Sequence, residues 1–409
     1  MLVASDLDRM NRQPFDIPPR WWSPKPSVLW MRAWRPLRRF HQLRRERILE
    51  VKVRGLDFVR GAMTAGHGVL VTPNHAGHGD CYLLWEAIDR LHSRCYVMTA
   101  WQVFQMAKGW ERLLYRQHGC FSINREGTDL QAFRQAVQVL AKTSYPLVIF
   151  PEGEVYHLNE RVTPFREGTG SIALSAVKRG GRPVTCIPCA LRYYYVRDPR
   201  PELEHVMGRL EERVFWRASP HLTLSERIVR FADGTLQLKE LEYLGHRAEG
   251  SLTERTNALA DVVLSRLEAH YGVATRGAST PERVKELRHQ VIERRRQLSR
   301  LDPAQADLSR DLDDLFFVVQ LFSYPGDYVT ENPTIERMAE TIDKFEEDFL
   351  GAPTARIRGT RRATVTFGQP VVIERHGARE GARRLTRALE DRVQQLLDEP
   401  APAAALVSA

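Results

Sequence analysis

The sequence contains no apolar run that approaches the roughly 20 residues needed to cross a lipid bilayer. Residues 1–16 carry acidic side chains and lack the continuous apolar segment of a secretory signal. These two absences predict a chain that stays in the cytoplasm and does not span a membrane.

Cysteine is scarce, with five residues in 409, and the odd number argues against a framework of paired disulfides. Cys186 and Cys189 have C-x-x-C spacing, but no second pair accompanies them, so we interpret them as core thiols. His75 and His78 are not followed by the further ligands that a metal site requires. We therefore expect no bound metal.

Positive charge is in excess, because 60 Lys and Arg residues outnumber 51 Asp and Glu residues. The net charge of +9 and the isoelectric point near 9.4 indicate a polyanionic partner. Nucleic acid, an anionic membrane surface and a phosphorylated substrate all fit, and composition alone does not choose among them.

Residues 1–54 are dense in aromatic and basic side chains. Trp21, Trp22, Trp30 and Trp34 lie here, and apolar positions recur every three or four residues from Trp30 onward, with arginines between them. Pro36 predicts a division into two short helices. Such a pair either lies in an anionic membrane interface or packs on the protein's own core with a solvated arginine face.

Residues 55–200 alternate between strand-like and helix-like segments, which is typical of an α/β fold with a central, mostly parallel sheet flanked by helices. The expected strands are residues 68–72, 94–99, 120–124, 146–150 and 184–194. The expected helices are residues 81–91, 101–116, 128–142 and 168–178. In such sheets ligands bind beyond the carboxyl ends of the strands.

Polar side chains follow three of these strands. His75 comes after the first strand, and Asp80, five residues later, opens a helix. A carboxylate that orients a histidine is the minimum equipment of a general base, although a lone Asp is also a common helix cap. Arg125 follows the third strand, where it can bind phosphate or carboxylate, and Glu152 follows the fourth.

The order of these residues resembles a known family. Four blocks are similar in sequence and spacing to those of the PlsC-like glycerolipid (lysophospholipid) acyltransferases: Asn74-His75-x4-Asp80, Gly119-x-Phe-x-x-Asn-Arg125, Phe150-Pro-Glu-Gly153 and Ile187-Pro188. Thr366-Phe-Gly-Gln-Pro370, before a helical segment at 381–397, resembles the closing strand and helix of that family.

The resemblance implies that a fatty acyl group moves from acyl-CoA or acyl carrier protein to a lysophospholipid hydroxyl, with 1-acylglycerol-3-phosphate as the leading acceptor. It implies that His75 deprotonates this hydroxyl and that Asp80 orients His75. It also implies a substrate site that contains Asn74, Arg125, Glu152, Gly153, Arg166, Gly168 and Pro188. No metal or redox cofactor is required.

Two positions depart from the family pattern, and the second bears on the acceptor. Gly77 stands where the family commonly has serine, and Glu154-Val155 stands where it often has Thr-Arg. At Glu154-Val155, a basic residue is missing and an acidic residue is added, which leaves open a non-phosphate acceptor, such as an aminolipid or a glycolipid. A third interpretation is a non-catalytic lipid-binding or scaffold protein, but the intact His75, Asp80 and Glu152 argue against it, because a binding module has no need of a base. Nucleic-acid binding rests on net charge alone and is not expected.

The remaining length predicts further parts. Residues 201–358 have the periodicity of a mostly helical insertion, and residues 359–398 supply the closing strand and helix of the core. Residues 399–409, rich in proline and alanine, are expected to be disordered. The amphipathic N-terminal segment and the positive net charge lead us to expect a peripheral protein on the inner, cytoplasmic face of an anionic membrane.

Overall fold

The computed structural model describes residues 18–275, 277–299, 301–352, 354–374 and 381–400. The chain divides into two compact units, one of Asp16–Pro199 with Ile357–Ala409 and one that contains Arg200–Arg356. The predicted disordered tail lies outside the described residues from residue 401 onward.

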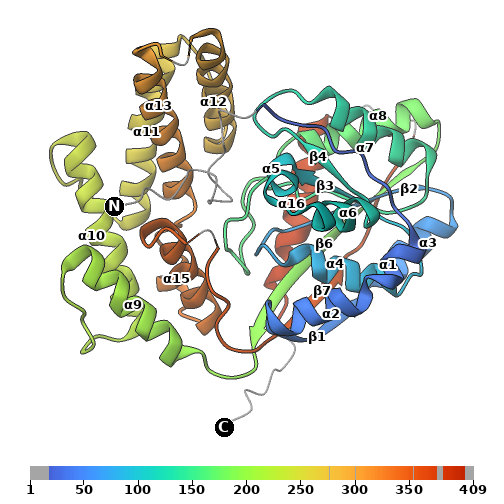
Figure 1. Ribbon diagram of the computed structural model, residues 1–409, viewed down its shortest axis with the longest axis horizontal. Coiled ribbons are helices and arrows are strands. Elements are labelled where there is room, and N and C mark those ends of the chain that lie inside the picture. The colour runs from blue at the N-terminus through green and yellow to red at the C-terminus, as the bar shows by residue number, and fades with distance from the viewer. Residues whose placement is uncertain (1–17, 276, 300, 353, 375–380, 401–409) are drawn as a thin grey trace. The chain divides into compact units, whose positions relative to one another are not determined.

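The first unit is built on an eight-stranded sheet with the order β1-β7-β6-β2-β5-β3-β4, in which β8 also pairs with β6 (Figure 1). The strands are β1 (Ile48–Arg54), β2 (Gly68–Pro73), β3 (Tyr96–Ala100), β4 (Cys120–Ile123), β5 (Leu147–Val148), β6 (Val184–Tyr195), β7 (Arg361–Phe367) and β8 (Val371–Ile373). Strands β6, β2, β5, β3 and β4 run parallel, whereas β7 and β8 run antiparallel to β6. The predicted α/β fold with a mostly parallel sheet is confirmed.

Helices cover both faces of this sheet. They are α1 (Val28–Ala33), α2 (Arg35–Arg44), α3 (Leu56–Thr64), α4 (Asp80–Asp89), α5 (Trp101–Met106), α6 (Gly109–Gln117), α7 (Leu130–Lys142), α8 (Gly168–Gly180) and α16 (Ala382–Asp398). Among the described residues, no helix combines the length and the apolar character that a membrane crossing requires.

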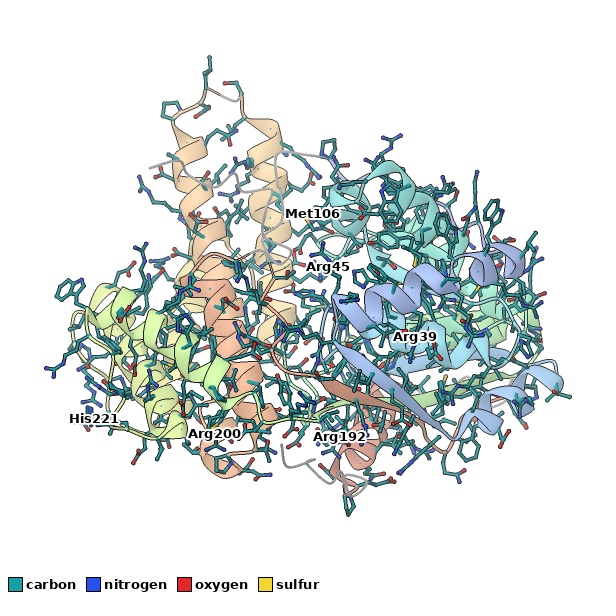
Figure 2. All side chains as sticks on the ribbon, turned by 60° about the horizontal axis from the view of Figure 1, so that its bottom comes forward. Arg39, Arg45, Met106, Arg192, Arg200 and His221 are labelled. Carbon is teal, nitrogen blue, oxygen red and sulfur yellow. The ribbon has the colours of Figure 1, made fainter. Side chains whose placement is uncertain are left out.

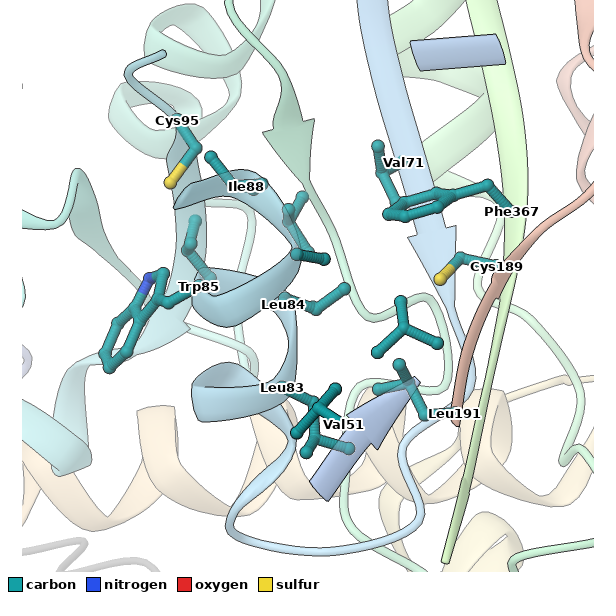
Figure 3. Packing of buried hydrophobic residues seen from close by; sticks show 14 of the residues in the cluster. Val51, Val71, Leu83, Leu84, Trp85, Ile88, Cys95, Cys189, Leu191 and Phe367 are labelled. Carbon is teal, nitrogen blue, oxygen red and sulfur yellow. The ribbon is translucent and has the colours of Figure 1, made fainter. Parts of the chain in front are cut away.

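The central strand β2 is apolar on both of its faces, as expected of a parallel strand between two helical layers. Val69 and Val71 belong to one core with Leu84 of α4, and Leu70 belongs to a second core with helices α7, α8 and α16. Figure 3 shows the first core, where Val71 lies beside Phe367 of β7. Packing on both sides fixes the end of β2 in space, and with it the loop that follows.

Two elements differ from the sequence-based prediction. Residues 48–54, assigned to the N-terminal segment, form strand β1 at the edge of the sheet, where they pair in parallel with β7, more than 300 residues further along the chain. The single helix expected at 101–116 is two helices, because Glu111 accepts the backbone N–H of Lys108 (2.6 Å) and caps a new helix there. The division of the N-terminal helices near Pro36 is confirmed.

In the second unit, the described residues of Arg200–Arg356 form α9 (Arg200–Phe215), α10 (Leu224–Leu244), α11 (Leu252–Tyr271), α12 (Thr280–Gln297), α13 (Ala304–Phe322), α14 (Tyr328–Glu331) and α15 (Ile335–Phe349). Helices α11, α12 and α13 share a core that includes Leu264, Val291 and Leu315. This stretch holds 22 Lys and Arg residues against 28 Asp and Glu residues. The rest of the chain holds 38 against 23, so the positive excess belongs to the part that contains the α/β sheet.

Candidate active site

The buried strand β2 ends at Pro73, and the loop beyond it carries His75 to the first turn of α4, where Asp80 begins the helix. His75 Nδ1 lies 2.8 Å from Asp80 Oδ2, and the backbone N–H of Gly77 donates to the same oxygen at 3.0 Å. The Asp80 side chain is fully buried, whereas 19% of the His75 side chain is exposed. Because Nδ1 is engaged by Asp80, Nε2 is the ring nitrogen that can accept a proton.

Opposing effects set the pKa of His75. Burial lowers it from the usual 6.5, the hydrogen bond and the charge of Asp80 raise it, and the charges of His78 and Arg125 lower it. The effect of burial is the largest, so the ring is neutral near pH 7. Neutral imidazole is the form that a general base requires.

Glu152 supports this loop from behind. Its Oε1 accepts the backbone N–H of His75 at 2.6 Å, and its Oε2 accepts the backbone N–H of Thr163 at 3.0 Å and the Thr163 hydroxyl. Burial, the largest influence, raises the pKa of Glu152 to about 7. Both carboxylate oxygens are committed to the protein, so the geometry favours a loop-positioning role over the direct substrate contact expected from the sequence.

Two arginines flank the turn that contains Gly153. Arg125 Nη1 donates to the Gly153 carbonyl at 2.6 Å, and Arg166 Nε donates to the Glu152 carbonyl at 3.3 Å. Gly153 has φ +80°, and a Cβ there would lie 2.3 Å from Arg166 Nε, so only glycine fits. Within the described structure Arg125 Nε is buried without a hydrogen-bond partner. The Arg125 residue as a whole is only partly buried, and its charge reaches His75, so it is a candidate to bind an anion close to that ring.

The other predicted substrate residues are placed differently. Asn74 is fully buried, and its amide exchanges two hydrogen bonds with the backbone of Leu191 in β6, at 3.0 and 2.7 Å. The expectation that Asn74 binds substrate is therefore corrected, because its donor and acceptor atoms join β2 to β6. Pro188 is buried in β6, where its carbonyl accepts the N–H of Gly368 at 2.8 Å, and Gly168 lies exposed at the start of α8.

Sequence reasoning missed two side chains that contact His75 and Asp80. The ring of Phe150 stacks on His75 with centroids 4.1 Å apart, and the Tyr193 hydroxyl donates to Asp80 Oδ1 at 2.6 Å. Phe150 begins the Phe-Pro-Glu-Gly block, so its position was a usable signal. Tyr193 gave none, because the alternation of β6 does not say which of its two faces meets α4.

The described part of the first unit offers no group of three His, Cys, Asp or Glu side chains with the spacing of a metal site. His78 and His157 meet edge to face with centroids 5.5 Å apart.

The N-terminal helices present an apolar surface. The side chains that form it are exposed on α1, α2 and α6, and we call them the outer apolar face: Leu29, Trp30, Leu37, Phe40, Leu43, Trp110 and Leu113. Arginines occur on the same segment, among them Arg39 of α2 and Arg45 at its C-terminal end (Figure 2). Trp21 and Trp22 do not belong to this face, because they pack against Phe121 and Phe104.

Helix α2 is turned opposite to an ordinary surface helix. Arg38 is only 3% exposed, and it binds Asp89 of α4 at 2.7 Å and the carbonyl of Met31 at 3.1 Å. Gln42 is buried as well and donates to the Tyr82 carbonyl at 3.2 Å. Phe40, by contrast, is 60% exposed. Polar contacts hold the inner face of α2 to the protein, and its apolar side chains are left outward.

Comparison with known proteins agrees with this geometry. The Acyltransferase family model matches residues 50–192, a range that contains His75, Asp80, Arg125 and Glu152. The glycerol-3-phosphate acyltransferase of Shewanella amazonensis is 26% identical over 174 residues, which cover 40% of this chain and 20% of that protein. The aligned part is thus about a fifth of the length of this relative.

Proposed function

We propose that the protein transfers a fatty acyl group from a thioester to a hydroxyl of a glycerolipid, and the match of residues 50–192 to the Acyltransferase family model supports this. The observation that carries the proposal is the pair formed by His75 and the buried Asp80 at the end of β2. A binding module has no need of a neutral, partly exposed histidine oriented by a carboxylate.

In the proposed reaction, His75 Nε2 takes the proton of the acceptor hydroxyl as its oxygen attacks the thioester carbonyl. The new C–O bond gives a tetrahedral intermediate, whose collapse breaks the C–S bond and releases a thiolate. The imidazolium of His75 then returns the proton to this sulfur. The Asp80 carboxylate stabilises the imidazolium. The thioester is acyl-CoA or acyl carrier protein, and the scheme uses no metal or redox cofactor.

The acceptor proposed first is a lysophospholipid, best 1-acylglycerol-3-phosphate. Arg125 supports this choice because its side chain is partly exposed and its charge reaches His75, and a guanidinium is well suited to bind a phosphate. Glycerol-3-phosphate, after which the relative from Shewanella amazonensis is named, carries the same phosphate. Glu154, the acidic departure from the family pattern, is buried and lies 3.7 Å from Arg166 Nη2, so the structure gives no added support to an acceptor with an amino group.

Replacing Arg125 by alanine is expected to raise the KM of a phosphate-bearing acceptor by about 10- to 100-fold, the value of one hydrogen bond to a charged group. The value of kcat should change much less, because His75 and Asp80 keep their contacts. Arg125→Lys keeps the charge but not the planar pair of donors, so its KM should lie between those of the wild type and Arg125→Ala. A change confined to kcat would contradict phosphate binding by Arg125.

We propose that the protein works on the inner face of an anionic membrane, and that the outer apolar face contacts the lipids. Exposed Trp, Phe and Leu beside arginines suit the boundary between headgroups and acyl chains. The positive excess outside Arg200–Arg356 supports attraction to anionic lipids.

The double variant Trp30→Ser, Phe40→Ser is expected to weaken binding to vesicles that contain anionic lipid by about 10- to 100-fold. The reason is that the transfer of two large apolar side chains from water into the lipid interface no longer contributes to binding. Cosedimentation measures the change. Leu238→Ser, Leu241→Ser is the matched control, since both leucines are about as exposed on α10. Equal loss in the two variants would argue against a specific lipid-binding face. Point substitutions are preferable to deletion of the whole N-terminal segment at 1–54, because that deletion would also remove strand β1.

The proposed activity is tested by thiol release from palmitoyl-CoA in vesicles. The panel of acceptors contains 1-acylglycerol-3-phosphate, glycerol-3-phosphate, a lysophospholipid without net charge and a single-chain aminolipid, with a diacyl lipid as the control that lacks a free hydroxyl. Release that depends on one acceptor supports the proposal and identifies the substrate. Absence of release with acyl-CoA and with acyl carrier protein as donor would refute it.

A further inference from the structure

The buried Asp80 has more partners than a histidine-orienting carboxylate needs. Oδ2 receives His75 Nδ1 and the Gly77 N–H, and Oδ1 receives the Tyr193 hydroxyl at 2.6 Å. Tyr193 lies 113 residues away in the sequence, on β6, and is only 7% exposed. A fully buried carboxylate is costly unless hydrogen bonds replace its water. Tyr193 provides the sole side-chain donor to Oδ1 among the described residues.

Tyr193 is itself held in place from the opposite side. The Arg361 guanidinium of β7 lies over its ring, 4.6 Å from the centroid. Arg361 Nη2 donates to the Glu46 carbonyl at 3.0 Å and lies 3.5 Å from Glu46 Oε2. Glu46 also closes on the loop before Asp80, because a Cβ at Gly79 would lie 2.6 Å from its Oε2. Glu46 and Arg361 therefore connect the segment after α2 with the ring that contacts Asp80.

We propose that Tyr193, with Arg361 behind it, is a positioning residue that holds the Asp80 carboxylate in the orientation that His75 requires. This inference rests on the proposed role of His75 as the base. Burial, and next the charge of Asp80, hold the pKa of Tyr193 well above 10.0, so its hydroxyl stays protonated and donates. Phenylalanine at this position would keep the ring under Arg361 and remove only the donor.

Removal of the Tyr193 hydroxyl should shift the pKa of His75 in one direction only, upward. Without the Tyr193 hydroxyl, the negative charge on Asp80 is less neutralised, so Asp80 attracts the His75 N–H more strongly and the pKa of His75 rises. The other groups that face this site are unchanged by the substitution: His78 in the same loop, Cys81 on α4, Arg125 after β4, Glu152 after β5, Cys189 on β6, Arg361 on β7 and Glu46 after α2. The shift therefore reports on one hydrogen bond.

The test compares Tyr193→Phe with Tyr195→Phe, which removes a hydroxyl two residues along the same face of β6. In Tyr193→Phe the midpoint of the His75 imidazole titration, followed by NMR and assigned with a His75→Asn sample, should move to higher pH by about 0.5–1.0. The acid limb of kcat should move with it, kcat at pH 7 should fall about tenfold, and KM should stay within about twofold. Tyr195→Phe should change none of these.

An unchanged His75 midpoint in Tyr193→Phe, or an equal change in Tyr195→Phe, would overturn the inference even if both proteins lose thermal stability. If Tyr193→Phe does not fold, Arg361→Gln keeps the hydroxyl and removes its support, and an unaltered kcat in that variant would also overturn it. The NMR titration needs no substrate. Failure of the wild type to transfer acyl groups would therefore refute the proposed function and leave this test in force.

Discussion

Replacing His75 by asparagine is expected to lower kcat for acyl transfer by about 10²- to 10⁴-fold, the usual contribution of a positioned general base. Asparagine is a close structural match, because its side-chain amide can still donate to Asp80 Oδ2, as Nδ1 does at 2.8 Å. The backbone N–H of residue 75 can still donate to Glu152. The variant therefore removes the proton acceptor and keeps the loop.

The measurement is acceptor-dependent thiol release, with the thermal unfolding midpoint recorded beside it. His67→Asn is the matched control, since His67 precedes the same strand and contacts Thr185 at 2.8 Å, away from Asp80. Wild-type kcat should fall on the acid side with a midpoint below 6.5, because burial lowers the pKa of His75 and only the neutral ring acts as the base. Full activity of His75→Asn would rule out the proposed mechanism.

Replacing Asp80 by asparagine is expected to lower kcat by about 10⁴-fold, as loss of the carboxylate does in other histidine-dependent sites. Three donors converge on the two oxygens of Asp80: His75 Nδ1, the Gly77 N–H and the Tyr193 hydroxyl. The side-chain amide of the Asp80→Asn variant has an NH₂ group in place of one carboxylate oxygen, so at least one of these three donors then faces an N–H group instead of an acceptor. Leaving such a buried group unsatisfied costs about 1–3 kcal/mol, so the free energy of unfolding should fall as well.

Asp89→Asn separates the two effects. Asp89 lies at the other end of α4, is 9% exposed at its side chain and binds Arg38 at 2.7 Å, so its loss should destabilise the protein without removing a group from the site. Denaturant unfolding measures the stability of both variants, and thiol release measures kcat. If Asp80→Asn and Asp89→Asn lost equal stability and equal activity, Asp80 would have only a structural role.

The orientation of α2 shows where sequence reasoning stops. The spacing of Trp30, Leu37, Phe40 and Leu43 predicted an amphipathic helix, and Pro36 predicted its division from α1. The sequence left open which face packs on the protein. That choice depends on Asp89, 51 residues away, which gives Arg38 a buried ionic partner and so turns the apolar face outward.

Asn74 and Glu152 show the same limit inside the site. Both belong to blocks that local spacing identified, and both were expected to bind substrate. Their actual partners are Leu191, 117 residues beyond Asn74, and Thr163 together with the His75 backbone for Glu152. A polar residue in a turn at a strand end has the same local sequence whether it faces a ligand or the backbone of a distant strand.

The sequence by itself determined what is local in this protein. The apolar run before Pro73, the five-residue step from His75 to Asp80 and the alternation of strands and helices are set by neighbouring residues, and they led to the α/β fold and the acyltransferase blocks. The tertiary structure alone decided the partners. Tyr193 against Asp80 and the antiparallel pairing of β7 with β6 arise from pairing across long stretches of chain, because the register between strands and the choice of buried face depend on the whole packed core.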